Sequence, residues 1–66
     1  MKAQSQEIYE FIKTYVEEHT FPPSHQEIAD GCFIAKGTVK YNLKKLEDAG
    51  LIYLEKGRAR GITLLE

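Results

Sequence analysis

Apolar side chains near the start of the chain recur three and four residues apart. This spacing puts them on one stripe of an amphipathic helix. The pattern predicts a helix that begins after Ser5, whose hydroxyl is suited to an N-cap, and runs to about Glu18. The proline pair at 22–23 prevents the helix from resuming. The apolar positions are Ile8, Phe11, Ile12, Tyr15 and Val16.

A second, short helix is predicted after the prolines. Ser24 and Glu27 have the spacing of a capping box, in which the hydroxyl accepts a bond from the Glu27 amide and the carboxylate accepts one from the Ser24 amide. The apolar pair at 28–29 would face inward. We expect Gly31 to end this helix by adopting a positive φ. Residues 32–34 are apolar and form a turn too short for a strand between helices.

The pattern predicts a third helix from about Lys36 to Ala49, with Gly50 just beyond its end. Val39, Leu43 and Leu46 fall on one side of this helix and give it a clear core stripe.

Residues 51–55 and 61–65 are predicted to be strands, because both runs are mostly apolar and β-favouring. The connection at 56–60 contains Gly57 and three basic residues, which favours a hairpin with a charged tip. The expected fold is α+β: one domain over residues 1–66, with three helices and a two-stranded β-hairpin. Two helices joined by a tight turn and followed by a basic hairpin are typical of a winged helix-turn-helix.

A net charge of −1 by itself argues against a nucleic-acid partner, but the charge is distributed unevenly along the chain. Residues 1–35 carry two basic and six acidic side chains, a formal charge of −4, whereas residues 36–66 carry seven basic and four acidic ones, a formal charge of +3. A chain divided in this way can present one basic face to a nucleic acid.

The third helix and the hairpin offer the chemistry that double-stranded DNA requires. The front of the third helix would enter the major groove, the next lysines would meet phosphates, and the hairpin would lie on the backbone or in the minor groove. The free backbone amides and the positive dipole end at the start of this helix also suit a phosphate. The candidate DNA-binding residues are Ser24, Lys36, Gly37, Thr38, Lys40, Tyr41, Lys44, Lys45, Lys56, Arg58 and Arg60.

Other classes of function find little support. Cys32 with His19 and His25 cannot supply the four ligands of a structural zinc site, and we expect no metal or other cofactor. We find no nucleophile–base set and no phosphate-binding loop, so neither an enzyme nor a small-molecule substrate is expected. No apolar run approaches the ~18 residues of a membrane span, and the first residues lack the apolar core of a signal peptide. With one unpaired cysteine, this predicts a cytoplasmic protein.

Several short motifs together resemble the N-terminal domain of LexA-type SOS repressors over essentially the whole chain. The motifs are Phe21-Pro22-Pro23-Ser24 with Glu27-Ile28-Ala29, then Leu43-Lys44-Lys45-Leu46, Gly50-Leu51-Ile52, and Arg60-Gly61-Ile62 before Leu64-Leu65.

The resemblance implies a repressor of transcription that binds a palindromic operator as a homodimer, one half-site for each copy. It also implies base contacts near the start of the third helix, where the family's positions fall on Ala35, Gly37, Thr38, Lys40 and Tyr41. The family's self-cleaving serine–lysine domain is not found in these residues, which suggests an excised domain or a stand-alone relative. The alternative interpretation is a winged-helix protein-interaction module, such as a small regulator or antirepressor, which the modest net charge and Tyr41 favour.

Overall fold

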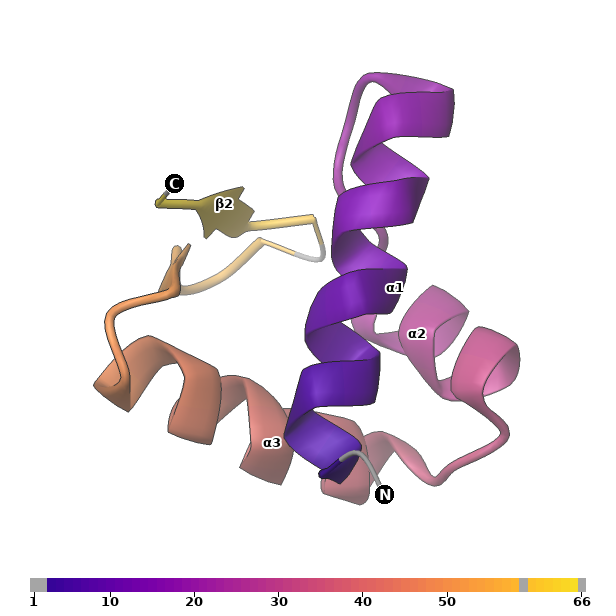
Figure 1. Ribbon diagram of the computed structural model, residues 1–66, viewed down its shortest axis with the longest axis vertical. Helices are drawn as coiled ribbons and strands as arrows, with labels where there is room; N and C mark the ends of the chain where they lie inside the picture. The colour runs from indigo at the N-terminus through magenta and orange to yellow at the C-terminus, as the bar shows by residue number, and fades with distance from the viewer. Residues whose placement is uncertain (1–2, 59, 66) are drawn as a thin grey trace.

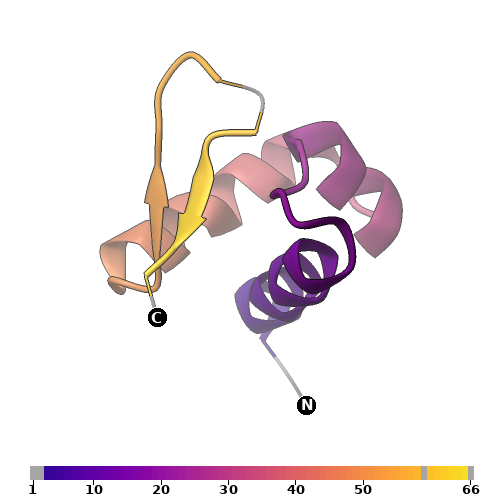
Figure 2. The same cartoon turned by 90° about the horizontal axis from the view of Figure 1, so that it is seen from above.

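The computed structural model describes residues 3–58 and 60–65, and it confirms the expected order of three helices and a hairpin (Figure 1). Helix α3 is the central element, since it packs against both other helices and against the first strand. Figure 2 shows the hairpin standing apart from α1 beside α3. The elements are α1 (Gln4–His19), α2 (His25–Cys32), α3 (Lys36–Asp48), β1 (Ile52–Leu54) and β2 (Ile62–Leu64).

The core lies where the three helices meet the hairpin. Each helix contributes the apolar stripe predicted for it, and each strand contributes one buried isoleucine. Phe11 and Val16 of the predicted stripe are partly buried against this core, and so is Tyr9, which the stripe did not include. Tyr15 instead packs beside His19 and Phe21 at the end of α1. The buried apolar residues are Ile8, Ile12, Ile28, Ala29, Val39, Leu43, Leu46, Ile52 and Ile62.

Helix α1 begins two residues earlier than predicted. Its N-cap is Ala3, which makes no side-chain capping bond, and Ser5 lies inside the helix, so the predicted serine cap is wrong. The early start has a visible reason. The Glu7 amide donates to the Ala3 carbonyl at 3.1 Å, and the Gln4 side chain in the first turn accepts a bond from Asn42 of α3. This tertiary contact stabilises the earlier start of the helix.

Helix α2 starts as predicted but ends differently. Both bonds of the capping box between Ser24 and Glu27 are present. Gly31, however, lies within the helix, and the residue with the left-handed backbone is Phe33 (φ 58°). A Cβ at position 31 would lie 2.3 Å from a ring carbon of Phe11, so glycine is needed here for close packing of α1 against α2. The prediction that Gly31 ends the helix with a positive φ is therefore wrong.

The end of α3 confirms the predicted role of Gly50. This residue has a φ of 79°, and its amide donates to the Glu47 carbonyl. The next amide, that of Leu51, donates to the Leu46 carbonyl. These two bonds form a Schellman motif, which turns the chain directly from α3 into the hairpin.

The strands pair antiparallel with Tyr53 opposite Thr63. Each strand is three residues long and therefore shorter than predicted, although the bonds from Leu65 to Leu51 and from Glu55 to Gly61 continue the pairing at both ends. Gly61 is buried where the connection closes, and a Cβ there would lie 2.6 Å from the Glu55 carbonyl oxygen. Only glycine fits this close approach.

Candidate nucleic-acid interface

The exposed side of α3 carries lysines at every fourth position. Lys36, Lys40 and Lys44 are all exposed and share one stripe of the helix. Gly37 is also exposed, and a Cβ there would meet open space, so the backbone can be approached closely. The N-cap, Ala35, is exposed and makes no side-chain capping bond. The front of α3 therefore offers two lysines and a helix N-terminus that no side chain caps.

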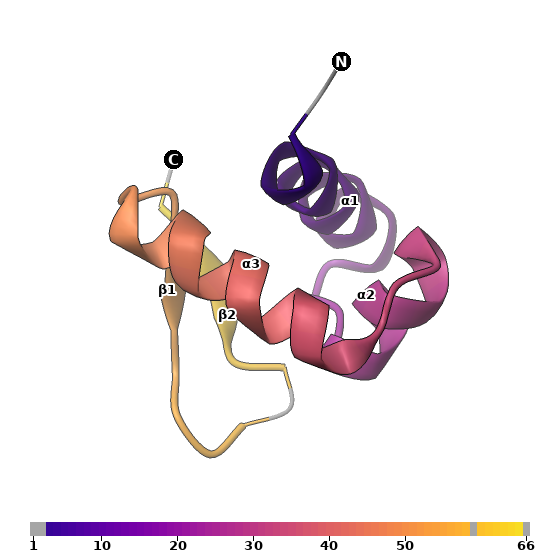
Figure 3. The same ribbon diagram turned by 90° about the horizontal axis from the view of Figure 1, so that it is seen from below.

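The connection between the two strands runs beside α3, as Figure 3 shows. One hollow on this side is lined by Lys40 of α3, His25 of α2, and Lys56 and Arg58 of the hairpin. An adjoining hollow is lined by Ser24, His25, Lys36 and Arg58 among others. Three elements thus bring their basic side chains to one surface. We call the residues Ser24, His25, Lys36, Lys40, Lys56 and Arg58 the basic surface.

The two ends of the α3 stripe differ in their ion pairs. Within residues 3–58 and 60–65, no carboxylate lies within ion-pair distance of Lys36 or Lys40. Lys44, in contrast, lies 3.3 Å from Asp48 and 3.8 Å from Glu47. The charge at the back of α3 is partly compensated, whereas the charge at its front is available to a partner.

Tyr41 and Lys45 lie on a neighbouring face of α3. The Lys45 ammonium is 5.6 Å from the centroid of the exposed Tyr41 ring, and the pair forms a cation–π contact. Lys45 also lines a hollow between α1 and the end of α3, apart from the two hollows of the basic surface. Thr38 is half-buried, and its carbonyl accepts a bond from Asn42. These predicted residues lie around the basic surface rather than within it.

Arg60 lies elsewhere than the predicted charged tip. Its two terminal nitrogens donate to the two carboxylate oxygens of Glu27, at 2.6 and 2.8 Å. It also donates to the Pro22 carbonyl at 2.9 Å, and its guanidinium lies 4.9 Å from the centroid of the Phe21 ring. The Tyr15 hydroxyl donates to the same carboxylate at 3.0 Å. Arg60 therefore ties the hairpin to α2 and to the segment before it, and we call the Glu27–Arg60 pair the anchor.

The pKa shifts differ between the anchor and the basic surface. The Arg60 guanidinium, followed by the Ser24 backbone amide, lowers the pKa of Glu27 to about 2. The same carboxylate raises the pKa of Arg60. On the basic surface, partial burial, then Lys40, then Lys36 lower the pKa of His25. The anchor stabilises the charged forms of Glu27 and Arg60, whereas the lysines of the basic surface disfavour protonation of His25.

Two contacts were missed by sequence reasoning. Asn42 is buried on the core side of α3, and it donates to the Gln4 side chain and the Thr38 carbonyl. The polar position inside an apolar stripe was the available signal for this buried residue. The Glu27–Arg60 bond joins residues 33 positions apart, and no local pattern could indicate it.

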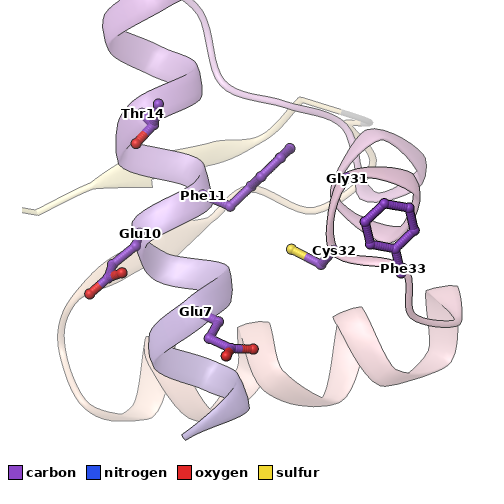
Figure 4. Close-up of a pocket in the computed structure, with 7 residues that line it drawn as sticks. All are labelled: Glu7, Glu10, Phe11, Thr14, Gly31, Cys32 and Phe33. Atoms are coloured by element: carbon purple, nitrogen blue, oxygen red, sulfur yellow. The ribbon is translucent and has the colours of Figure 1, made fainter. Parts of the chain in front are cut away.

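A hollow of different chemistry lies between α1 and the end of α2 (Figure 4). Glu7 and Glu10 of α1 and the ring of Phe11 form one side, while Cys32 and Phe33 come from α2 and its C-cap. Phe33 is 93% exposed. Partial burial, then the negative charge of Glu7, raises the pKa of the Cys32 thiol. An acidic rim would repel phosphates, so this side is unsuited to a nucleic acid.

Two other kinds of feature are missing from residues 3–58 and 60–65. Among the residues that the structure describes, no group of three or more His, Cys, Asp or Glu side chains could hold a metal ion. In the same described ranges, no helix is both long and apolar enough to cross a membrane.

A helix pair joined by a tight turn, with a hairpin beside its second helix, defines the winged helix-turn-helix class. Residues 1–61 match the family described as "LexA DNA binding domain". The chain belongs to this family. The expected fold and the resemblance noted in the sequence are both confirmed.

Similar proteins carry the name LexA repressor. The chain is 40% identical over 60 residues to that of Desulfatibacillum aliphaticivorans and 40% identical over 65 residues to that of Roseiflexus sp. strain RS-1, which covers 89% and 97% of this chain. It is 41% identical over 63 residues to that of Listeria monocytogenes, which covers 94% of this chain. The chain spans only about 30% of the length of these relatives.

Proposed function

We propose that this chain is the operator-binding part of a LexA-like transcriptional repressor and acts on double-stranded DNA without catalysis of its own. The first half of α3 enters the major groove, and the tip of the hairpin lies on the backbone or in the minor groove. One observation carries the proposal. The basic side chains of α3 and the hairpin converge on one surface, with the start of α2 between them. Such a surface matches two successive features of B-DNA, a groove and its phosphates.

The residues of α3 divide into two roles in this proposal. Gly37 and Lys40 are exposed near the front of the helix, and Tyr41 is exposed on the neighbouring face. In the proposed complex these three residues meet base edges. Ala35 and Lys36 lie at the helix start, where backbone amides and positive charge suit a phosphate. Glu47 and Asp48 follow at the rear and would repel DNA. The insertion is therefore limited to the front half of α3.

Two copies on a palindromic site complete the proposal. A single domain holds one half-site, and a second copy raises the overall affinity through effective concentration. The names of the relatives, which are repressors about three times as long as this chain, support a regulator of transcription.

Salt-dependent binding tests the proposal. We expect the affinity for a duplex chosen by selection from random sequences to fall steeply with salt, because each phosphate contact releases a counterion. Lys40→Ala should cost ~1–3 kcal/mol and relax selectivity at one position, since this lysine is placed against a base edge. An equal loss on every duplex would instead assign Lys40 to a phosphate. Undetectable binding to all duplexes at low salt would refute the proposed function.

The α1–α2 hollow supports a second candidate, a protein-interaction module. An acidic rim beside the exposed Phe33 ring and the half-buried Phe11 ring suits a protein segment with basic and apolar side chains. Phe33→Ser should then abolish capture of such a partner while Lys40→Ala and Arg58→Ala have no effect on it. A chain that binds no DNA but shows this pattern would favour the second candidate.

A further inference from the structure

We propose that His25 is a proton-dependent ligand of a DNA phosphate. The phosphate binds where α2, α3 and the hairpin tip meet. The inference rests on the proposed function and adds a particular contact and its pH dependence to it. It begins from an overlap: His25 and Arg58 line both hollows of the basic surface. These two residues form the boundary between the hollows, and an anion bound at this boundary would touch all three elements.

The surroundings of His25 are mostly cationic. From α3 it faces Lys36 and Lys40, and from the hairpin it faces Lys56 and Arg58. The acid on this side is Glu55, which lies 3.4 Å from Arg58 and so offsets part of its charge. The neighbours on its own helix are Ser24 and Gln26, which are neutral. A cluster of this composition suits an anion with several oxygens.

Donors for such an anion are present at the start of α2. The capping box uses the amides of Ser24 and Glu27, and the Ile28 amide donates to the Ser24 carbonyl. The amides of His25 and Gln26 therefore remain for a ligand in the part of the chain that the structure describes. The imidazole of His25 likewise has no hydrogen-bond partner among the described residues. His25 lines both hollows, and Gln26 lines one of them.

Proton binding couples to this site with a definite sign. Without DNA, partial burial and the two lysines hold the pKa of His25 below 6.5, so the ring is neutral at neutral pH. A phosphate within a few ångströms favours the protonated ring and raises its pKa. The bound state then takes up a proton that the free state lacks. Affinity must be lowest above the bound-state pKa, rise as pH falls through it, and level off below the free-state pKa.

The test measures affinity for a short mixed-sequence duplex between about pH 5 and pH 8 at constant ionic strength. A phosphate contact does not read sequence, so the operator is not required. The wild-type chain should bind more tightly as pH falls, by about tenfold for each unit of pKa difference between the free and bound states. His25→Gln should lose this gain, so that its affinity changes little between pH 8 and pH 5.

His19→Gln is the matched control. His19 is exposed at the end of α1, where its ring packs beside Tyr15 and Phe21, and it faces neither hollow. This variant should keep the full pH dependence. The pKa of His25, followed by NMR, should also rise when the duplex is added.

Three results bear on the inference in separable ways. A gain at low pH that is lost only in His25→Gln supports it. Binding that is independent of pH, or a pH dependence that survives in His25→Gln, overturns the role of His25 and leaves DNA binding intact. Absence of binding by the wild-type chain at every pH overturns the proposed function together with the inference. Melting curves for each variant, recorded at the same pH values, show that the fold is retained.

Discussion

The hairpin connection carries two arginines in very different environments. Arg58 is exposed, and its partner, Glu55, belongs to the same hairpin. Arg60, two residues further, reaches across to α2 and forms two bonds with Glu27. The same type of side chain thus supplies a solvent-exposed charge at one position and a structural tie at the other. The difference shows that a basic tip in a sequence is not one functional unit, because tertiary partners decide which charges stay available.

The largest expected effect sets the reference for a purely structural loss. Leu43→Ala removes a fully buried side chain from the central helix and should lower the free energy of unfolding by ~2–5 kcal/mol. Chemical denaturation measures this change. Lys44→Ala, at the exposed neighbouring position, is the control and should leave stability nearly unchanged. An unchanged melt for Leu43→Ala would mean that the core face of α3 has been misidentified.

Arg60→Ala is expected to affect both folding and binding. It removes the tie between the hairpin and α2, so the melting temperature should fall and the hairpin should lose its fixed orientation. We expect DNA affinity to drop by about tenfold because the basic side chains of the tip are no longer held in place. Binding and thermal melting are measured on the same sample. If the variant loses affinity with no change in melting or in the NMR spectrum of the hairpin, Arg60 contacts DNA and is not an anchor.

The anchor also predicts how stability depends on acid. The pKa of Glu27 is about 2 in the folded chain against 4.5 ordinarily, so the folded state favours the carboxylate. Its contribution is fully present above pH 4.5 and is lost as the pH falls from there through about 2. Glu27→Gln should flatten this part of the stability curve, whereas Glu55→Gln should not. A similar slope in both variants would contradict the comparison.

Arg58→Ala should give the smallest effect of the series. Its pair with Glu55 is exposed and contributes little to folding, so the melting curve should stay the same. The affinity should fall a few-fold on every duplex, and the salt dependence should flatten by about one contact. Titrations at several salt concentrations provide the slope. An unchanged slope would remove the hairpin tip from the DNA surface.

Much of the fold could be predicted because its signals are local. The capping box at Ser24, the core stripe of α3 and the glycine after α3 each depend on residues within a few positions. The errors arose where a distant contact decided the outcome. Gly31 serves the Phe11 ring rather than the helix end, and α1 begins early where Gln4 meets Asn42.

The candidate site was predicted as a set of residues but not as a geometry. Lys36, Lys40, Lys56 and Arg58 were identified from charge and helix position, and the structure gathers them on one surface. The pairing of Lys44 and the anchoring role of Arg60 could not be predicted, because both depend on where acidic partners lie in space. Contact of any of these residues with DNA stays a prediction.

The anchor has a consequence for how the molecule opens. A short hairpin is marginally stable by itself in water and would ordinarily fray in local fluctuations. Here its connection is tied by Arg60 to a carboxylate that also caps α2, so separating the strands disturbs the start of that helix as well. The hairpin and α2 therefore belong to one cooperative unit, and their amide protons should exchange with solvent through a shared opening event.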